Sequence, residues 1–315
     1  MASSSAYTLA TGRNRNIGVV LPFVDRWFFS TILEGAESAL LENGYDLTLY
    51  NLSGGDDHRD RVFNNLLLRK RVDAVLTVAV KLSPSELENL TRMRKPILGI
   101  GGPIPGARTL SINDRGAGRL AAEHLISLGH TRIGIIGGTP ASEMQFRQPG
   151  QRRDGYQDAM DAAGLEVLPN WFAEADFTIQ GAYYEAKQML GDPRIAPTAI
   201  FCASDEMGFG TIMAAKDLGL RVPQDISVIG FDDHDMSGFF GLSTISQSSR
   251  AQGRRAAEML VELLGDEELD SHINIEHNVE WPIELIVRSS TARATPPGTP
   301  PGPARSGRRR PGAQP

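Results

Sequence analysis

Between Ile17 and Ser290 the sequence alternates short apolar runs with longer stretches of helical periodicity. The run "IGVVLP" at 17–22 is followed by "FFSTILEGAESALLENG", in which apolar side chains recur at helical spacing and the final glycine is a typical C-terminal stop. The apolar runs are nearly continuous, which is typical of parallel strands covered by helices on both faces. This alternation, with its short connections, predicts a doubly wound α/β architecture built from right-handed β–α–β units.

The two halves of this stretch are alike. Ile17 and Ile133 open similar apolar runs, and Gly44 and Gly164 end the helices that follow at nearly the same offset. We therefore expect two similar parallel-sheet lobes. Because ligands of open α/β sheets bind beyond the carboxyl ends of the strands, a ligand cleft is expected between the lobes.

Charge and cysteine content narrow the functional classes. The net charge of −6 argues against a general polyanion-binding surface, which needs a basic face. A single cysteine, Cys202, excludes an internal disulfide and fits a reducing compartment. The first residues lack the charged and apolar segments of a secretory signal, and no apolar run approaches the ~20 residues that span a bilayer. We therefore expect a cytoplasmic protein.

The C-terminal segment 291–315 is rich in proline, glycine and arginine. Such a composition cannot bury enough apolar area to offset the entropy of ordering, so we expect this tail to be disordered. Its arginines leave open a contact with nucleic acid or acidic lipid, against the alternative of a solvated tail.

Enzyme signatures are mostly absent. The glycines of "GIGGPIPG" at 99–106 are interrupted by prolines, no GxxxxGK[ST] phosphate loop is present, and Ser204 lies outside a GxSxG motif. We expect no catalytic residues, no cofactor and no metal. The cluster "FDDHD" at 231–235 leaves three interpretations open, namely metal ligation, hydrogen bonding to a hydroxylated ligand, and loop capping.

Polar and aromatic side chains stand at strand ends or helix starts along the chain. They are Arg26, Phe28, Phe29, Arg152, Ser204, Asp205, Asp232 and Gln247. Aromatic faces stack on the apolar faces of sugar or purine rings, while carboxylates, amides and guanidinium groups bind hydroxyl edges. Core packing at a helix start is the alternative for either phenylalanine taken alone. Together these residues favour a cleft for a small molecule.

Many short motifs in one order make the chain similar to a known family. Among them are "LATGRNRNIGVVLP", "AAEHLISLGHTRIGIIGG", "RRDGYQDAM", "PTAIFCASDEMGFGTI" and "VPQDISVIGFDD". Over residues 6–290 the chain resembles the effector-binding core of the LacI/GalR family of bacterial transcription regulators. That core is in turn similar to periplasmic sugar-binding proteins of the ribose type.

The resemblance implies ligand contacts from both lobes. Phe28 and Phe29 would contribute from the first lobe, and Arg152, Phe177, Asp205 and Asp232 from the second, with Gln247 near the crossover. Two departures bear on the ligand. Arg26 and Trp27 stand where sugar-binding relatives usually have Asn-Pro, and Ser204 where an asparagine is common. They raise the hypothesis of an anionic sugar derivative held by Arg26, beside that of a neutral sugar.

The resemblance also implies a mechanism. Lobe closure on an effector would change the placement of the first lobes in a homodimer and so control operator DNA, as in a repressor. DNA contact would need a helix-turn-helix head, which we expect to be absent from this chain. Residues 1–15 are similar to a remnant of the hinge below such a head. The hinge motif is Leu9, Ala10, Thr11, Gly12 and Arg13.

The expected lobes exchange segments. The first lobe comprises 16–129 with 246–270, and the second comprises 130–245 with 271–290. A periplasmic sugar-binding protein that serves a transporter is the alternative function, since it would share this fold. The hinge-like opening and the lack of a secretory signal favour the regulator.

Overall fold

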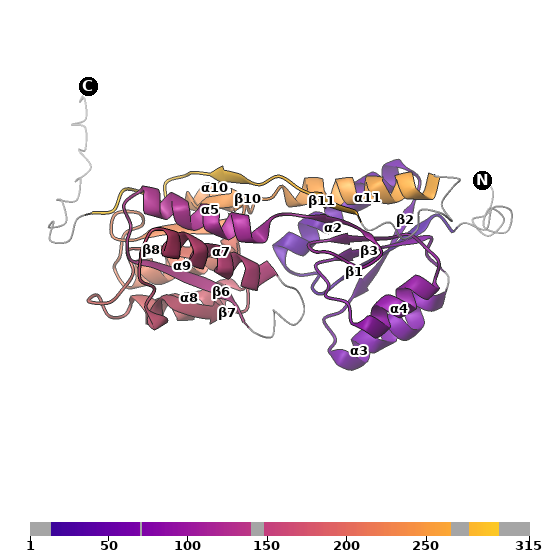
Figure 1. Ribbon diagram of the computed structural model, residues 1–315, viewed down its shortest axis with the longest axis horizontal. Helices are drawn as coiled ribbons and strands as arrows, with labels where there is room; N and C mark the ends of the chain where they lie inside the picture. Colours follow the sequence, from indigo (N-terminus) through magenta and orange to yellow (C-terminus); the bar gives the residue numbers. More distant parts are fainter. Residues whose placement is uncertain (1–13, 70, 140–147, 266–276, 296–315) are drawn as a thin grey trace, which may run out of the picture.

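A computed structural model describes residues 14–69, 71–139, 148–265 and 277–295. They form two lobes side by side along the long axis of the molecule (Figure 1). Each lobe is built on one six-stranded, mostly parallel sheet with helices on both faces. The predicted two-lobe, doubly wound α/β fold is confirmed.

The first sheet is parallel throughout. Its strands are β1 (Asn16–Leu21), β2 (Asp46–Asn51), β3 (Ala74–Val78), β4 (Ile97–Ile100), β5 (Arg108–Ser111) and β11 (His277–Glu280), in the spatial order β11-β5-β4-β3-β1-β2. One face is covered by α2 (Trp27–Glu42) and α11 (Ser249–Gly265). The other face packs on α3 (Asp56–Arg61), a π-helical turn (Val62–Leu66), a 3₁₀ turn (Leu67–Arg69) and α4 (Pro84–Arg92). Because both faces are covered, every residue of β3 is buried.

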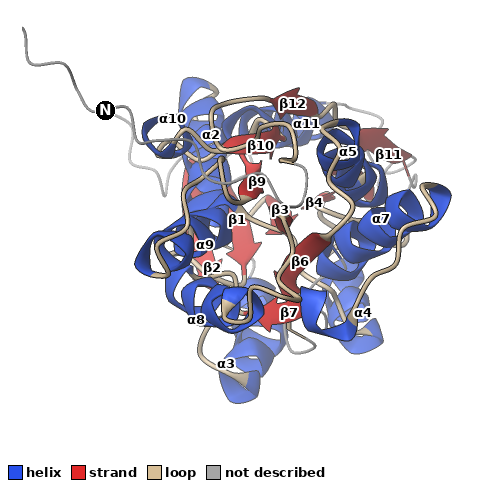
Figure 2. Cartoon of the chain, turned by 90° about the vertical axis from the view of Figure 1, so that its left-hand side faces the viewer, coloured by secondary structure: helices blue, strands red, loops and turns tan. Residues whose placement is uncertain are grey.

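The second sheet repeats this order. Its strands are β6 (Ile133–Gly138), β7 (Phe172–Ala175), β8 (Ala199–Cys202), β9 (Ser227–Asp232), β10 (Ser243–Ser246) and β12 (Glu284–Ile286), in the order β12-β10-β9-β8-β6-β7. Helices α5 (Asp114–Ser127) and α7 (Gln148–Ala162) lie on one side, and α8 (Ile179–Leu190) and α9 (Asp205–Asp217) on the other (Figure 2). The connections carry a 3₁₀ turn (Pro169–Trp171) and the short α10 (Ser237–Phe240). Only β12 is antiparallel to its neighbour among the described strands.

Three helix pairs cross so closely that a side chain would not fit at the contact. A Cβ on Gly253 of α11 would lie 2.0 Å from the carbonyl oxygen of Ile32 in α2. A Cβ on Gly155 of α7 would lie 1.9 Å from the carbonyl oxygen of Arg115 in α5, and Gly210 of α9 meets α8 in the same way. The glycines therefore set the distance between paired helices.

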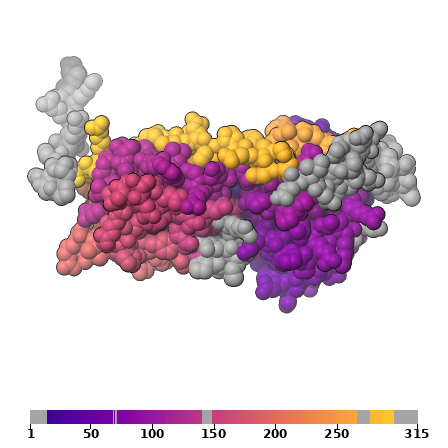
Figure 3. Space-filling view, in the orientation of Figure 1, coloured from indigo at the N-terminus to yellow at the C-terminus, as the bar shows by residue number. Residues whose placement is uncertain are grey.

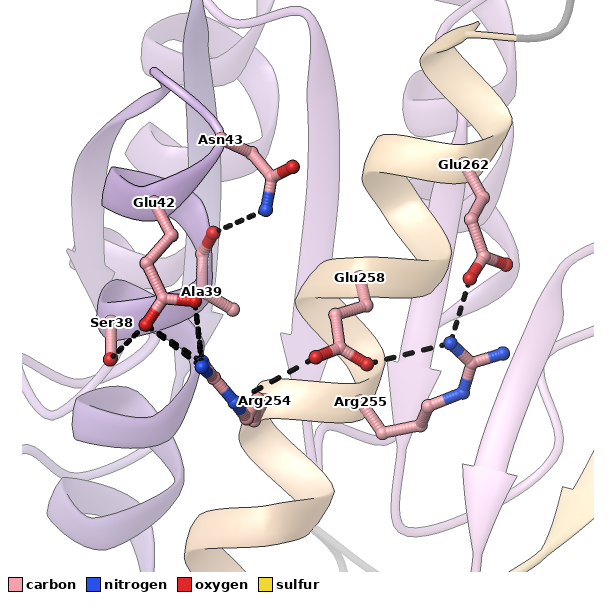
Figure 4. A network of polar contacts seen from close by, with 8 residues as sticks. All are labelled: Ser38, Ala39, Glu42, Asn43, Arg254, Arg255, Glu258 and Glu262. Atoms are coloured by element: carbon pink, nitrogen blue, oxygen red, sulfur yellow. Dashed lines mark hydrogen bonds and ion pairs between the residues drawn. The ribbon is translucent and has the colours of Figure 1, made fainter.

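Arginine–glutamate pairs line the exposed edge of the α2–α11 pair. Arg254 of α11 reaches Glu42 of α2 at 2.7 Å and also approaches Glu258 on its own helix (Figure 4). Arg255 continues the row to Glu262 at 2.7 Å. Exposed ion pairs contribute little to stability, so the buried apolar side chains that both helices place in one cluster are the main link between them.

The predicted helix stop at Gly44 is confirmed, and α4 begins at a capping box. Ser83 Oγ accepts a hydrogen bond from the backbone N–H of Glu86, whose carboxylate accepts from the N–H of Ser83 at 2.7 Å. This capping box satisfies two N–H groups that the first turn of α4 leaves without helical partners. After α2, Gly44 has a φ of 73°, a left-handed conformation that favours glycine and ends the helix.

The chain crosses between the lobes three times, after β5, after β10 and after β11. In the last crossing, residues 277–295 run along one edge of both lobes (Figures 1 and 3). The assignment of all of 271–290 to the second lobe is wrong for 277–280. These residues pair with β5, where Asn278 Oδ1 accepts hydrogen bonds from the Thr109 and Ser111 hydroxyls at 2.9 Å.

The tail expectation is wrong for its first residues. Thr291 Oγ1 lies 2.9 Å from Ser243 Oγ, and the Ala294 N–H donates to the Leu128 carbonyl at 2.9 Å. These bonds hold residues 291–295 on the second lobe. The rest of the expected tail, 296–315, and the expected hinge motif from Leu9 to Arg13 lie outside the described residues.

Candidate functional site

A cavity lies where the carboxyl ends of the two sheets meet. Eight of the side chains predicted for the ligand site line it: Arg26, Phe28, Phe29, Arg152, Phe177, Ser204, Asp232 and Gln247. The first three follow β1 and the others follow β6, β7, β8, β9 and β10. The two lobes therefore contribute opposite walls of one site, as expected for ligands of parallel sheets.

Arg152 forms the centre of the second-lobe wall. Its Nε donates to Asp114 Oδ1 at 2.8 Å, and its Nη1 donates to the Ala203 carbonyl at 2.7 Å. The guanidinium lies over the Phe231 ring, 3.5 Å from the ring centre. Burial raises the pKa of Asp114 even though the guanidinium opposes this shift. The pair holds the guanidinium in one plane beside the cavity.

Asp232 ends β9 with its carboxylate at the cavity wall. Gln247 Nε2 donates to Asp232 Oδ1 at 2.5 Å, and Gln252 Nε2 in turn donates to the Gln247 carbonyl at 2.6 Å. Burial raises the pKa of Asp232 to about 8; nearby Asp205 adds to the shift and Arg152 opposes it. A carboxyl with this pKa can meet a ligand as an acid or as a carboxylate near neutral pH.

The backbone at the wall is strained. Phe177 and Asp232 have φ values of 61° and 108°, and Ala79 has 49°, all on the left-handed side that non-glycine residues rarely adopt. Each such residue costs on the order of 1–3 kcal/mol, and strain of this kind gathers at functional sites.

Asp205 is not among the side chains that line the cavity as far as the chain is described. Its carboxylate accepts hydrogen bonds from Ser237 Oγ at 2.6 Å, Thr244 Oγ1 at 2.7 Å and the His234 N–H at 2.8 Å. Asp205 therefore anchors the loop after β9 from behind the wall. Beside it, Ser204 lines the cavity and caps α9 by accepting from the Met207 N–H at 3.3 Å.

Two hydrogen bonds donated by wall residues cross from lobe to lobe. The Arg26 guanidinium in the first lobe donates to the backbone carbonyl of Asp176 in the second. The Gln148 amide in the second lobe donates to the Gly101 carbonyl in the first. The structure therefore shows the lobes in contact across the site.

Four polar wall residues were not predicted, namely Asp114, Gln148, Glu206 and Gln252. Asp114 stands at a helix start directly after a strand, a position that could have been read from the sequence. Glu206 follows the predicted Asp205 by one residue. Gln148 and Gln252 lie inside helical segments with no local signal.

The "FDDHD" cluster divides between the wall and its support. Asp232 faces the cavity, while Asp233 pairs with Arg288 at 2.6 Å. In the described part of the chain no three His, Cys, Asp or Glu side chains gather as a metal-binding group. No helix of the same residues is long and apolar enough to cross a membrane.

Comparisons with known proteins identify the family of the chain. The family model of a periplasmic binding protein-like domain matches residues 122–291. The HTH-type transcriptional repressor PurR of Aliivibrio salmonicida is 32% identical over 276 residues, which cover 86% of this chain and 81% of that protein.

Solved structures of regulators share the two-lobe fold. A LacI family transcriptional regulator from Enterococcus faecium with bound ribose has a TM-score of 0.76 at 25% identity, covering 89% of this chain and 100% of that one. The lac repressor dimer bound to operator and the anti-inducer ONPF has a TM-score of 0.78 at 25% identity, covering 93% and 99%. The chain therefore belongs to the LacI/GalR family of transcription regulators and carries the effector-binding core of that family.

Proposed function

We propose that this chain binds a small sugar-like effector between its lobes and thereby controls the hold of a homodimeric repressor on operator DNA in the cytoplasm. The cavity with walls from both lobes carries the proposal. A ligand held by both walls binds the closed arrangement better than an open one, and this difference in affinity shifts the equilibrium between them. Similarity to repressors favours this function over the periplasmic alternative.

The wall favours a ring that carries hydrogen-bond donors. Phe28 and Phe177 offer aromatic faces, and Asp232 and Glu206 offer carboxyl oxygens. Within the described chain the buried Oε1 of Gln148 has no hydrogen-bond partner. Buried acceptors are normally satisfied, so a ligand O–H or N–H would complete this one. A hydroxylated ring with an apolar face fits these groups.

The charges favour a neutral ligand over the anionic one. Arg152 is already paired with Asp114, and Arg26 donates to the Asp176 carbonyl. Burial raises the pKa of Glu206, and the positive charge of Arg26 opposes this shift. Both guanidinium groups thus have partners within the protein and are already engaged before an anionic ligand arrives.

Calorimetry and thermal unfolding against a matched ligand panel test this function. The panel pairs neutral pentoses, hexoses and nucleosides with their phosphate and acid derivatives. We expect a neutral member to raise the melting temperature and Phe177→Ala to weaken its binding at least tenfold. Tyr184→Ala, an exposed aromatic on α8, is the control and should bind as wild type. Binding by anionic members alone, or by no member, would contradict the proposal.

The exposed surface of α10 supports a homodimer. Phe239 is 86% exposed, and Met236 and Phe240 beside it are also exposed. Adjacent large apolar side chains on a surface mark interaction sites more often than isolated ones do. We propose that a second copy of the chain covers this surface, which lies on the second lobe next to the boundary between the lobes.

A further inference from the structure

One contact between the lobes lies outside the cavity wall. Trp27, the first residue of α2, stacks on His234 in the loop between β9 and α10, with ring centres 4.7 Å apart and planes 27° apart. The indole Nε1–H donates to Asp235 Oδ2 at 3.2 Å. Within the described chain Trp27 does not line this cavity but a second hollow, which Asp235 also lines. The contact therefore joins the lobes outside the proposed ligand cavity.

The imidazole of His234 is held firmly on the second lobe. The Met236 N–H donates to His234 Nδ1 at 2.9 Å, and the His234 N–H donates to Asp205 Oδ2. The ring of Phe209 meets the imidazole edge-to-face at 5.2 Å and stacks on Phe240 at 4.5 Å. These contacts fix the orientation of the His234 imidazole, and the indole of Trp27 stacks on it.

Both partners are directly linked to wall residues. Trp27 stands between Arg26 and Phe28, which line the cavity from the first lobe. His234 follows Asp232 by two residues in the second-lobe wall. When the indole rests on the imidazole, the two walls are held at the distance seen in the structure.

We infer that Trp27 is a positioning residue for effector binding, which holds the lobes closed by stacking on His234. The inference rests on the proposed function. A closed form that is already populated before binding raises the apparent affinity in proportion to its population. Loss of an aromatic stack and one hydrogen bond would therefore weaken binding about tenfold, although no ligand contact is removed.

Variants on both sides of the contact test the inference. We expect Trp27→Ala and His234→Ala each to weaken binding of the best neutral ligand from the panel about tenfold, mainly through faster dissociation. Trp27→Phe keeps an aromatic ring that can stack on His234 and should weaken binding less. The double variant should lose no more than Trp27→Ala alone, because that substitution already removes both the stack on His234 and the hydrogen bond to Asp235. Leu41→Ala, at the exposed far end of α2, is the matched control.

Small-angle X-ray scattering of the ligand-free protein gives a second readout. Trp27→Ala should increase the radius of gyration and Trp27→Phe should increase it less, whereas loss of a mere ligand contact would leave it unchanged. Scattering can be measured even if no panel member binds. It therefore distinguishes failure of this inference from failure of the proposed function. Unchanged affinity and scattering in Trp27→Ala would overturn the inference. Weaker binding with unchanged scattering would also overturn it. If Trp27→Ala does not fold, the affinity and the radius of gyration of His234→Ala and Trp27→Phe are compared with those of the wild type instead.

Discussion

The side chains of Arg152 and Asp114 form a buried ion pair, with 2.8 Å between Nε and Oδ1 and side-chain exposures of 8% and 3%. The pair links α7 to α5 at the cavity wall. Because both side chains are almost fully buried, each charge depends mainly on the other for compensation. The ion pair therefore contributes to the stability of the fold and also fixes the geometry of the cavity wall.

Replacing Arg152 by methionine should lower the free energy of unfolding by about 3–5 kcal/mol, because it leaves the Asp114 carboxylate buried without a partner. Adding Asp114→Asn should restore part of the loss. Arg115→Met is the matched control, since Arg115 pairs with Asp158 across the same two helices but with 60% and 36% exposure. It should cost much less than Arg152→Met, because exposed ion pairs contribute little to stability. Urea unfolding measures all three, and equal losses in the two arginine variants would contradict the prediction.

Asp232→Asn should change how stability depends on pH. The Asp232 carboxyl has a pKa of about 8 in the folded protein, mainly because of burial, against about 4 in an unfolded chain. Between these values the folded protein retains a proton that the unfolded chain has released. The free energy of unfolding therefore falls as pH rises through this window.

The asparagine variant lacks this titration, so its stability should fall less steeply between about pH 5 and pH 9. Asp205, whose pKa burial raises to about 7, keeps part of the slope in the variant. Urea unfolding at several pH values measures both slopes. Parallel curves for the variant and wild type would show that Asp232 titrates normally.

Gly253→Ala should destabilise the first lobe. The added methyl would lie 2.0 Å from the Ile32 carbonyl oxygen, so α2 and α11 would have to move apart. Overpacking of this kind costs about 1–3 kcal/mol. Gly265→Ala, at the end of the same helix and with no atom within 4 Å of the added Cβ, should be neutral or slightly stabilising. Thermal unfolding of both variants makes the comparison, and equal melting temperatures would refute it.

Phe239→Glu should convert the proposed homodimer into monomers, because it places a charge in the centre of an apolar contact. Tyr184→Glu introduces the same charge at an exposed aromatic on α8 and should leave the dimer intact. Sedimentation velocity distinguishes the two masses. A wild-type protein that sediments as a monomer would remove the basis for this surface as an interface.

Much of the fold could be predicted because its signals are local. The apolar run from Ile17 to Leu21 is buried on both sides and reads as a central parallel strand. Ser83 and Glu86 lie three residues apart and close a capping box within one turn. The strand His277–Glu280 is different, since its polar residues pair with a strand about 170 positions earlier through contacts that no local pattern encodes.

The site was predictable to the extent that its residues follow strands. Asp232 and Asp205 both come at strand ends, but one carboxylate faces the cavity and the other faces Ser237 and Thr244 behind it. Sequence position does not show which way a side chain points after a strand. Gln148 reaches the cavity from the first turn of α7, at a position that no apolar pattern in the sequence marks.

The exchange of segments between the lobes bears on the order in which the nascent protein can fold. Helix α11 supplies core side chains such as Ala256 and Leu260 to the cluster around Ile17, yet it is translated after nearly all of the second lobe. Helix α2 can cover part of this face of the first sheet early, but the part that α11 covers stays exposed until some 250 residues have been made. The second lobe waits longer still, because β12, the edge strand of its sheet, is translated after β11 has completed the first sheet.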